Sequence, residues 1–167
     1  MAVPVLSVGD VLTASFCNTW FTPDAVYKTA DQTVTSSTTL VNDSELFLAG
    51  LSASAEYKME AWISFLANSA VDIKWGWSVP AGASMAYSAL HNEGGGTGFG
   101  ASADVKAETD VPMAAGGSPT PTAIVMKGKL TTAGSSGTLQ FKWAQNTSNA
   151  SATHVRVRCY ITLDRIG

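Results

Sequence analysis

Two runs of alternating apolar and polar residues, back to back in residues 55–79, constrain the fold of this chain more than any other feature. An apolar residue at every second position is the period of a β-strand with one buried face. The apolar set of the first run is Tyr57, Met59, Ala61, Ile63 and Phe65, and that of the second is Val71, Ile73, Trp75, Trp77 and Val79. Each run therefore predicts a strand that lies on a hydrophobic core.

The small residues between the two runs suit a tight connection. We therefore predict a β-hairpin with its turn centred on Asn68, in which Ala61 faces Trp75. On the opposite face, this register would place Trp62 beside Lys74 as a cation–π pair. A shift by one residue would turn one apolar face into water, so a hairpin here would have a strongly specified register.

Similar alternation continues in shorter segments that are divided by Gly, Pro and Ser. Further candidate strands cover residues 26–35, 39–48, 85–89, 101–111, 124–130, 139–143 and 155–163, the last being the most regular. The glycines and serines of residues 134–137 indicate a hairpin loop. Eight or nine strands without a long helix predict an all-β fold, an antiparallel, jelly-roll-like β-sandwich. Trp75, Trp77 and Trp143 would fill its core.

The first 23 residues differ from the rest, so we divide the chain into an N-terminal arm, 1–23, and a sandwich domain, 24–167. The arm is apolar, and a short helix is expected in it with Thr13 as its N-cap. Phe16 and Trp20 are four residues apart and would share one face of that helix. Such a helix is too short to be stable alone. The arm therefore covers its own sandwich or anchors the chain to a partner.

Charge and composition exclude several functional classes. The chain has 10 Lys and Arg against 13 Asp and Glu, which gives no basic surface for nucleic acid or anionic lipid. Its apolar runs are too short for a membrane-spanning helix. The N-terminus lacks the basic segment of a secretory signal, so we expect a reducing compartment, where Cys17 and Cys159 stay free. Cys159 has the inward parity of its strand and would be buried.

Residues able to carry catalysis are few. His91 and His154 have no metal-ligating residue at the usual spacing, and the glycine-rich residues 94–100 lack the lysine ending of a phosphate loop. The carboxylates that could form a catalytic pair are Glu60, Asp72, Asp104 and Glu108. Two of these, Glu60 and Asp72, have the outward parity of their strands, which indicates solvated or intersubunit charges. We therefore predict no catalytic residue, no cofactor and no metal.

Several segments resemble a domain of virion proteins from phages that infect actinobacteria. The similar segments are residues 11–14 (VLTA), 18–20 (NTW), 25–31 (AVYKTAD), 36–40 (SSTTL), 42–43 (ND), 79–83 (VPAGA) and 139–147 (LQFKWAQNT). The resemblance extends from Val11 to Ile166, and residues 27–31 and 143–147 are its most specific parts. It implies a non-enzymatic structural module of the virion, of the tail-fibre or head-decoration type.

The length of the chain favours one of these types. A fibre usually has a shaft or attachment domain, whereas this chain is one module with a short arm. We therefore expect a capsid decoration protein that binds the major capsid protein and cements the lattice. The alternative is a tail-fibre or receptor-binding tip that recognises the host surface. A third possibility is an enzyme or carbohydrate-binding module outside this family.

Surplus aromatic residues predict a homotrimer. Trp62 and Tyr160 have the outward parity of well-alternating strands, and exposed aromatic residues mark an interface. A closed ring would bury them and let Arg156 or Arg158 meet an acidic residue of a neighbour, Glu60 or Asp72. The predicted interface residues are Phe16, Trp20, Phe21, Trp62, Arg156, Arg158 and Tyr160.

Overall fold

The computed structural model describes residues 7–15, 17, 23–91, 100–116 and 119–167, with residues 100–104 described by their backbone. In this part of the chain, no helix is long and apolar enough to cross a membrane. The strands are β1 (Asp24–Tyr27), β2 (Gln32–Val34), β3 (Val41–Leu51), β4 (Glu56–Leu66), β5 (Ile73–Ser78), β6 (Ser84–His91), β7 (Gly100–Ala107), β8 (Met113–Ala114), β9 (Thr122–Thr131), β10 (Gly137–Gln145), β11 (Thr153–Val155) and β12 (Tyr160–Arg165).

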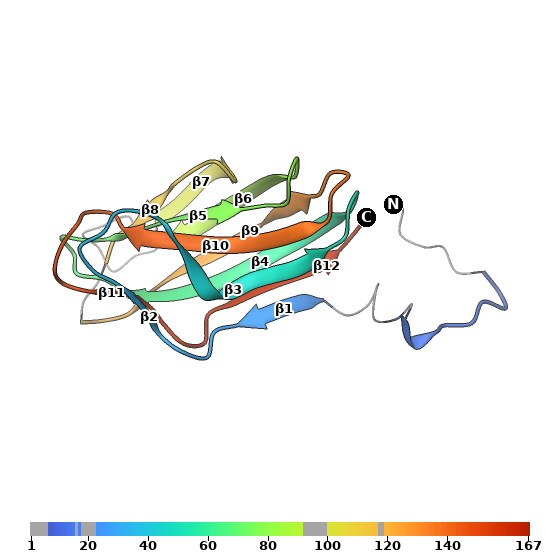
Figure 1. The fold of residues 1–167 in the computed structure, drawn as a ribbon, viewed down its shortest axis with the longest axis horizontal. Coiled ribbons are helices and arrows are strands. Elements are labelled where there is room, and N and C mark those ends of the chain that lie inside the picture. The colour runs from blue at the N-terminus through green and yellow to red at the C-terminus, as the bar shows by residue number, and fades with distance from the viewer. Residues whose placement is uncertain (1–6, 16, 18–22, 92–99, 117–118) are drawn as a thin grey trace.

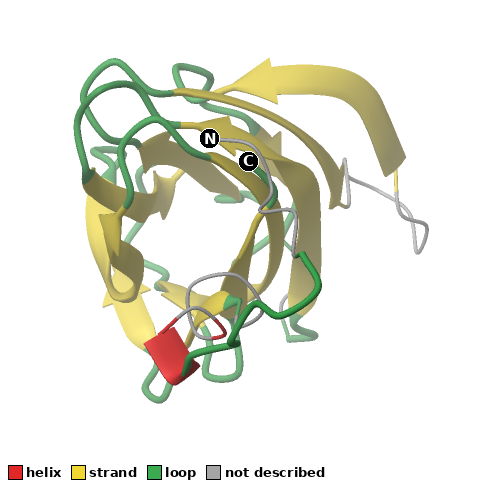
Figure 2. Cartoon of the chain, turned by 90° about the vertical axis from the view of Figure 1, so that its right-hand side faces the viewer, coloured by secondary structure: helices red, strands yellow, loops and turns green. Residues whose placement is uncertain are grey.

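Strands β3 to β10 form a jelly roll, which is a long antiparallel hairpin rolled into two facing sheets. The first strand pairs with the last and so on inward: β3 with β10, β4 with β9, β5 with β8, and β6 with β7. Rolling adds the pairs β5–β10 and β6–β9. The sheet orders that result are β3-β10-β5-β8 and β4-β9-β6-β7. The predicted antiparallel, jelly-roll-like sandwich is therefore confirmed (Figures 1 and 2).

Four further strands widen the second sheet beyond β4. β11 and β12 pair with successive parts of β4. On their other side, β2 pairs with β11 and β1 pairs with β12. The widened sheet reads β1-β12-β4-β9-β6-β7 across its length. β1 also contacts β3 of the four-stranded sheet, so the added strands bring the two sheets together along this edge.

The core lies between the two sheets and is built from the inward residues of each strand. The apolar set predicted for residues 57–65 is buried in full, as are Val71, Ile73, Trp75 and Trp77 of the second run. Trp143 of β10 is also fully buried, opposite Trp75. Each such aromatic residue removes about 150–250 Å² from water, an upper bound of roughly 4–6 kcal/mol.

The predicted hairpin of residues 55–79 is wrong, although both of its strands exist. β4 belongs to the eight-stranded sheet and β5 to the four-stranded sheet, so Ala61 pairs with Ile161 and Met126 and does not face Trp75 as a strand partner. Trp62 is likewise not a neighbour of Lys74. The bend does form at Asn68, whose backbone oxygen accepts the N–H groups of residues 71 and 72. It carries the chain across the core from one sheet to the other.

Residues 134–137 do not form a hairpin loop either. They lie where the chain passes from β9, in the eight-stranded sheet, to β10, which begins at Gly137 in the four-stranded sheet. In a jelly roll, both arms of the long hairpin alternate between the sheets, so consecutive strands usually face one another across the core. Among the pairs of the roll, β6 and β7 alone are consecutive in the described chain.

The most regular predicted strand, residues 155–163, is interrupted. In β11, Val155 pairs with Phe65, whereas in β12, Tyr160 pairs with Trp62. Residues 156–159 therefore lie opposite only residues 63 and 64 of β4, a bulge of two extra residues that includes Arg158 at φ 72°. An even insertion preserves the alternation of side chains, so the sequence pattern does not reveal it.

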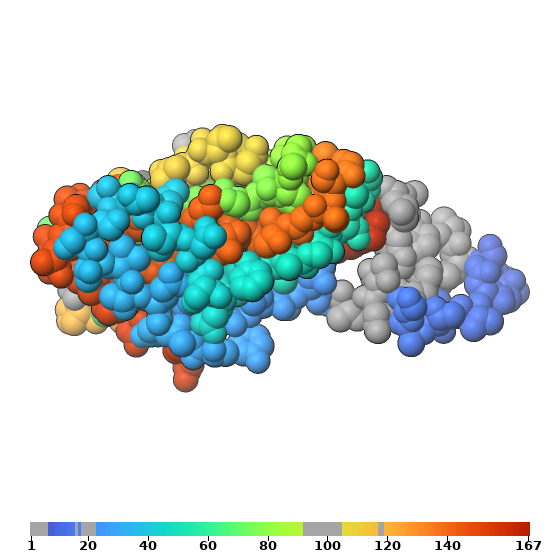
Figure 3. Space-filling model, in the orientation of Figure 1, coloured from blue at the N-terminus to red at the C-terminus, as the bar shows by residue number. Residues whose placement is uncertain are grey.

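The N-terminal arm contains the expected helical turn. Ala14, Ser15 and Cys17 are helical, and the Cys17 N–H donates to the Thr13 carbonyl at 3.0 Å, as it would with Thr13 as N-cap (Figure 2). Residues 7–15 are exposed and extend beyond the body of strands (Figure 3). Cys17 and Cys159 are both free thiols, and Cys159 is fully buried as predicted.

Candidate interaction surface

A row of large apolar side chains crosses the outer face of the eight-stranded sheet. Directly paired residues share a face, and the pairs run Tyr27–Tyr160, Tyr160–Trp62, Trp62–Val125 and Val125–Leu90. The neighbours of each in its own strand point into the core, so all five point outward. We call Tyr27, Tyr160, Trp62, Val125 and Leu90 the outer row.

The outer row is accessible to solvent over most of its length. Tyr27 is 70% exposed, Leu90 45% and Tyr160 41%, while Trp62 and Val125 are half-buried between them. The row crosses five adjacent strands, β1, β12, β4, β9 and β6, which at about 4.8 Å per strand spans about 19 Å. Single exposed apolar residues are ordinary on protein surfaces, but a continuous strip of this width is not.

An open depression of about 400 Å³ adjoins the outer row where the bulge lies. Its lining consists of Trp62, Ser64, Pro121, Arg156, Val157 and Arg158. The bulge is held by Asp31 from the loop between β1 and β2. One Asp31 oxygen, Oδ1, accepts the Val157 N–H at 2.8 Å, and the other, Oδ2, lies 2.8 Å from Arg156 Nε. Arg158 is exposed and makes no ion pair in the part of the chain described.

Charged residues border the row on its other side. Glu60 of β4 lies 3.2 Å from Lys58 Nζ and 3.5 Å from Lys127 Nζ. The hydrogen bond from Lys58 and the charge of Lys127 lower the pKa of Glu60. An apolar strip flanked by charged residues has the composition of a protein–protein interface, with an apolar centre and a polar rim.

Four of the seven predicted interface residues are brought together here. Trp62, Arg156 and Arg158 line the depression, and Tyr160 pairs directly with Trp62. Phe16, Trp20 and Phe21 lie outside the described residues. The sequence interpretation missed Tyr27, Val125 and Leu90, although each is a large apolar residue with outward parity. Single residues of this kind are common, and only the register of the sheet places them in one row.

The predicted contacts of these charges need correction in two places. Asp72 does not lie on an outer strand face: it precedes β5 in the bend, at φ 56°, and its carboxylate accepts the Gly116 N–H at 3.0 Å. Arg156 already has an acidic partner in its own chain, Asp31. Glu60 is likewise paired within its own chain, with Lys58 and Lys127, so Arg158 is the predicted interface charge that has no ion pair among the described residues.

The histidines are separated from one another. His91 is buried, with its ring 5.4 Å from that of Trp75, and His154 Nδ1 is 2.9 Å from the Thr33 hydroxyl. Within the described ranges, no group of three His, Cys, Asp or Glu residues is placed to hold a metal ion. Glu108 accepts the Met85 N–H at 2.9 Å, and the Asp104 side chain is outside what the structure describes.

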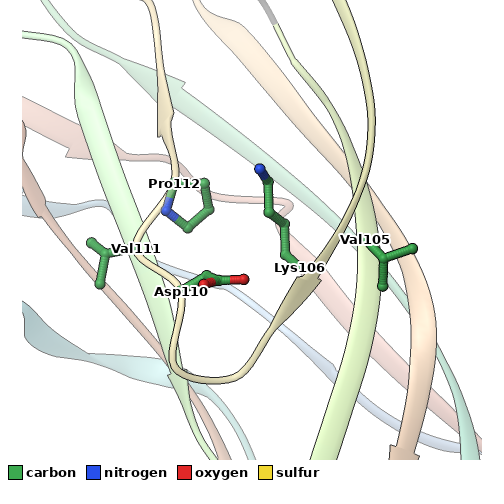
Figure 4. Close-up of a pocket in the computed structure, with 5 residues that line it drawn as sticks. All are labelled: Val105, Lys106, Asp110, Val111 and Pro112. Carbon is green, nitrogen blue, oxygen red and sulfur yellow. The ribbon is translucent and has the colours of Figure 1, made fainter.

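A second open depression, of about 430 Å³, lies beside the edge strand β7. Val105 and Lys106 of β7 and residues 110–112 of the following loop line it (Figure 4). The Asp110 carboxylate accepts the Ala107 N–H at 2.7 Å and so closes the turn between the two segments. That bond gives Asp110 a structural role.

Comparison with known proteins assigns no family. No protein-family model and no curated protein matches the chain. Among solved structures, chains from the Gx and Gt strains of infectious bursal disease virus are similar, with TM-scores of 0.19 and 0.18 and identities of 10% and 12%. The alignments cover 99% and 97% of this chain but 41% and 43% of the viral chains.

Proposed function

We propose that this chain is a structural protein of a virus particle and acts by binding other protein subunits rather than by catalysis. The observation that carries the proposal is the outer row, five large apolar side chains in one register across the sheet. Leaving such a strip in water is unfavourable, and covering it with another subunit removes that cost. The resemblance of residues 27–31 and 143–147 to phage virion proteins supplies the viral setting.

The more specific proposal is a capsid decoration protein that binds the major capsid protein as a homotrimer. Two apolar surfaces of one chain support self-association, namely the outer row and the exposed Val8, Val11 and Leu12 of the arm. The exposed Arg158 and the row's acidic neighbour Glu60 add complementary charge. A cyclic trimer repeats one such contact three times and leaves no surface open for further growth.

A tail-fibre or receptor-binding tip is the alternative. The aromatic character of the row favours it, because Tyr27, Tyr160 and Trp62 present adjacent rings beside an Arg-lined depression. Aromatic faces with polar groups nearby are suited to binding sugars of a host surface. This alternative predicts an uncovered row in the assembled particle.

Imaging the particle that contains this protein distinguishes the two. For a decoration protein, the density of the jelly roll lies on the capsid lattice with the outer row covered. Density at the tail tip with the row facing solvent would establish the alternative. If the purified particle contains no copy of the chain, both proposals are refuted.

A further inference from the structure

A buried lysine and a buried aspartate meet beneath the edge where the two sheets come together. Lys28 lies in the loop between β1 and β2, and Asp43 lies near the start of β3. Lys28 Nζ is 2.8 Å from Asp43 Oδ1, and neither side chain has any exposed area. Glu45, two residues after Asp43, places its Oε2 3.5 Å from the same nitrogen. The outer row does not include any of these residues.

The surroundings of Asp43 match those of a carboxyl group prepared for attack by a nucleophile. Its Oδ1 accepts two backbone N–H groups, from Glu45 and Leu46, both at 3.0 Å. Two N–H groups on one oxygen are the arrangement that stabilises the oxyanion of an acyl-transfer intermediate. The other oxygen, Oδ2, accepts the indole N–H of Trp143 at 3.2 Å. The two oxygens therefore have different environments, one suited to an oxyanion and one to a leaving group.

Glu45 is held beside the lysine as a carboxylate. It accepts hydrogen bonds from the Thr29 hydroxyl, the Thr29 N–H and the Ala30 N–H, all from the loop that carries Lys28. These bonds, the Thr29 hydroxyl first, lower the pKa of Glu45 to about 2. With so low a pKa, Glu45 is a weak base, so its part beside the amine is to relay a proton and not to hold it.

Burial makes the ion pair itself costly. Removing two charges from water carries a desolvation penalty that their attraction repays only in part. Condensation of the two groups requires both to be uncharged, which one proton passed from Lys28 to Asp43 would achieve. An amine held against a carboxylic acid in a dry site brings together the two groups that condense to an amide.

We propose that Lys28 and Asp43 join in an isopeptide bond that the chain forms by itself. The Lys28 nitrogen attacks Asp43 Cγ, and the negative charge develops on Oδ1 against its two N–H donors. Glu45 accepts a proton from the attacking nitrogen and delivers it to Oδ2. The Cγ–Oδ2 bond breaks and water leaves. Of the three ammonium protons, one stays on the amide nitrogen and two leave with Oδ2, so the reaction is balanced without an oxidant or co-reactant.

The mass of the intact protein tests this directly. The full chain, purified after folding and then denatured, is expected to be lighter than its sequence by one water molecule. Proteolysis should release the peptides of Lys28 and Asp43 as one branched species. A mass equal to that of the sequence, after prolonged incubation of the folded protein, would overturn the proposal and leave an ordinary buried ion pair.

Variants identify the role of each group. Lys28→Arg should restore the full mass, and Glu45→Gln should slow the loss of water at least tenfold. Asp43→Asn should still react but lose ammonia in place of water, an outcome that an adventitious dehydration would not give. Lys58→Arg is the matched control, because Lys58 contacts Asp164 at 3.4 Å in an exposed pair, and its variant should still lose one water. Loss of water from Lys28→Arg would place the reaction elsewhere and refute the assignment.

Discussion

The Cys159 side chain fills the buried side of the bulge between β11 and β12. Its Sγ accepts the Ser64 N–H at 3.1 Å and donates to the Arg156 carbonyl at 2.9 Å, and the side chain is fully buried. Burial is the main cause that raises the pKa of the Cys159 thiol to about 11. Thiolate is the reactive form, so both the pKa and the burial protect this residue.

We therefore expect the two cysteines to differ in reactivity. In the folded protein at neutral pH, a thiol reagent should modify Cys17, which is partly exposed, and leave Cys159 unmodified. Mass spectrometry after timed labelling measures this, and Cys17→Ser should remove the fast-reacting thiol. In urea, Cys159 should react as well. Labelling of Cys159 at the same rate in the folded and unfolded protein would contradict the packing described.

Glu45 gives an expected pH dependence of stability. Its pKa is about 2 in the folded protein, below the ordinary value of 4.5, chiefly because of the Thr29 hydroxyl. A carboxyl group whose pKa is lower in the folded than in the unfolded protein stabilises the folded state at pH values above its unfolded-state pKa. This stabilisation is lost as the pH falls towards its folded-state pKa. The contribution of Glu45 to the free energy of unfolding should therefore decrease as the pH is lowered from about 4.5 to about 2.

Comparing wild type with Glu45→Gln isolates this contribution. Urea unfolding at several pH values should show the wild type losing more stability than the variant across that window. Glu56→Gln serves as a control, because Glu56 contacts the exposed Lys129 in the same fold. Equal slopes for wild type and Glu45→Gln would show that the loop does not hold this carboxylate.

Buried apolar residues were predictable one by one, whereas buried charges were not. Period two identified Met59, Ile63 and Trp75 as core residues because hydrophobicity alone fixes the side on which they lie. Asp43 interrupts the alternation of residues 39–48, which by itself indicates a break in a strand. Its burial depends on Lys28, fifteen residues earlier, and on Trp143 in another strand. Contacts of that kind are set by topology and leave no local pattern.

At the scale of elements, the same limit explains the failed hairpin. Alternation shows that a strand has a buried face but does not identify the strand beside it. β4 and β5 bury their faces against each other across the core, and this satisfies the pattern as well as pairing in one sheet would. Ala61 is buried in the observed packing, as it would be in the predicted hairpin, so Ala61→Leu is still expected to overpack the core.

The bulge between β11 and β12 yields a prediction about Asp31. Its carboxylate satisfies the Val157 N–H, one of the backbone groups that the bulge removes from the ladder with β4. Asp31→Ala should destabilise the fold by about 1 kcal/mol, a reduced figure because the side chain is partly exposed. Hydrogen exchange at the Val157 amide should accelerate more than at amides of β12.

Asp31→Asn is the informative comparison for that variant. Its amide oxygen can still accept the Val157 N–H but carries no charge for Arg156. It should retain most of the amide protection while losing the ion pair. If Asp31→Ala leaves the Val157 amide as protected as in the wild type, the bulge is held by other contacts.

At the scale of the whole molecule, the outer row and the arm show what a single copy leaves uncovered. The parity of Trp62 and Tyr160 identified part of this surface from the sequence. Tyr27, Val125 and Leu90 joined it only through the pairing of β1, β9 and β6 with their neighbours. A surface assembled from five strands is a property of the sheet, so no segment of the sequence contains it.

The final prediction concerns assembly through this surface. If copies associate through the outer row, Trp62→Ser combined with Tyr160→Ser should weaken each subunit contact by about 2 kcal/mol or more, since buried Trp and Tyr dominate interface energies. A loss of about 2 kcal/mol lowers the equilibrium constant of one contact about thirtyfold, and a closed trimer loses it at each of its three contacts. Sedimentation velocity over a range of concentrations measures the shift from trimer to monomer, and thermal unfolding verifies that the variant still folds.

Phe47→Ser provides the matched control. Phe47 is 43% exposed, close to the 41% of Tyr160, but it lies on β3 in the four-stranded sheet. If the outer row is the contact, Phe47→Ser should leave the trimer unchanged. A general effect of surface hydrophobicity would instead weaken the trimer of Phe47→Ser as much as that of the double variant. A wild type that sediments as a monomer at every concentration would refute the trimer. The row would then remain exposed in solution, so its partner would have to be a different protein of the particle. In that case the Trp62 and Tyr160 double variant should fail to bind the particle, whereas Phe47→Ser should bind normally.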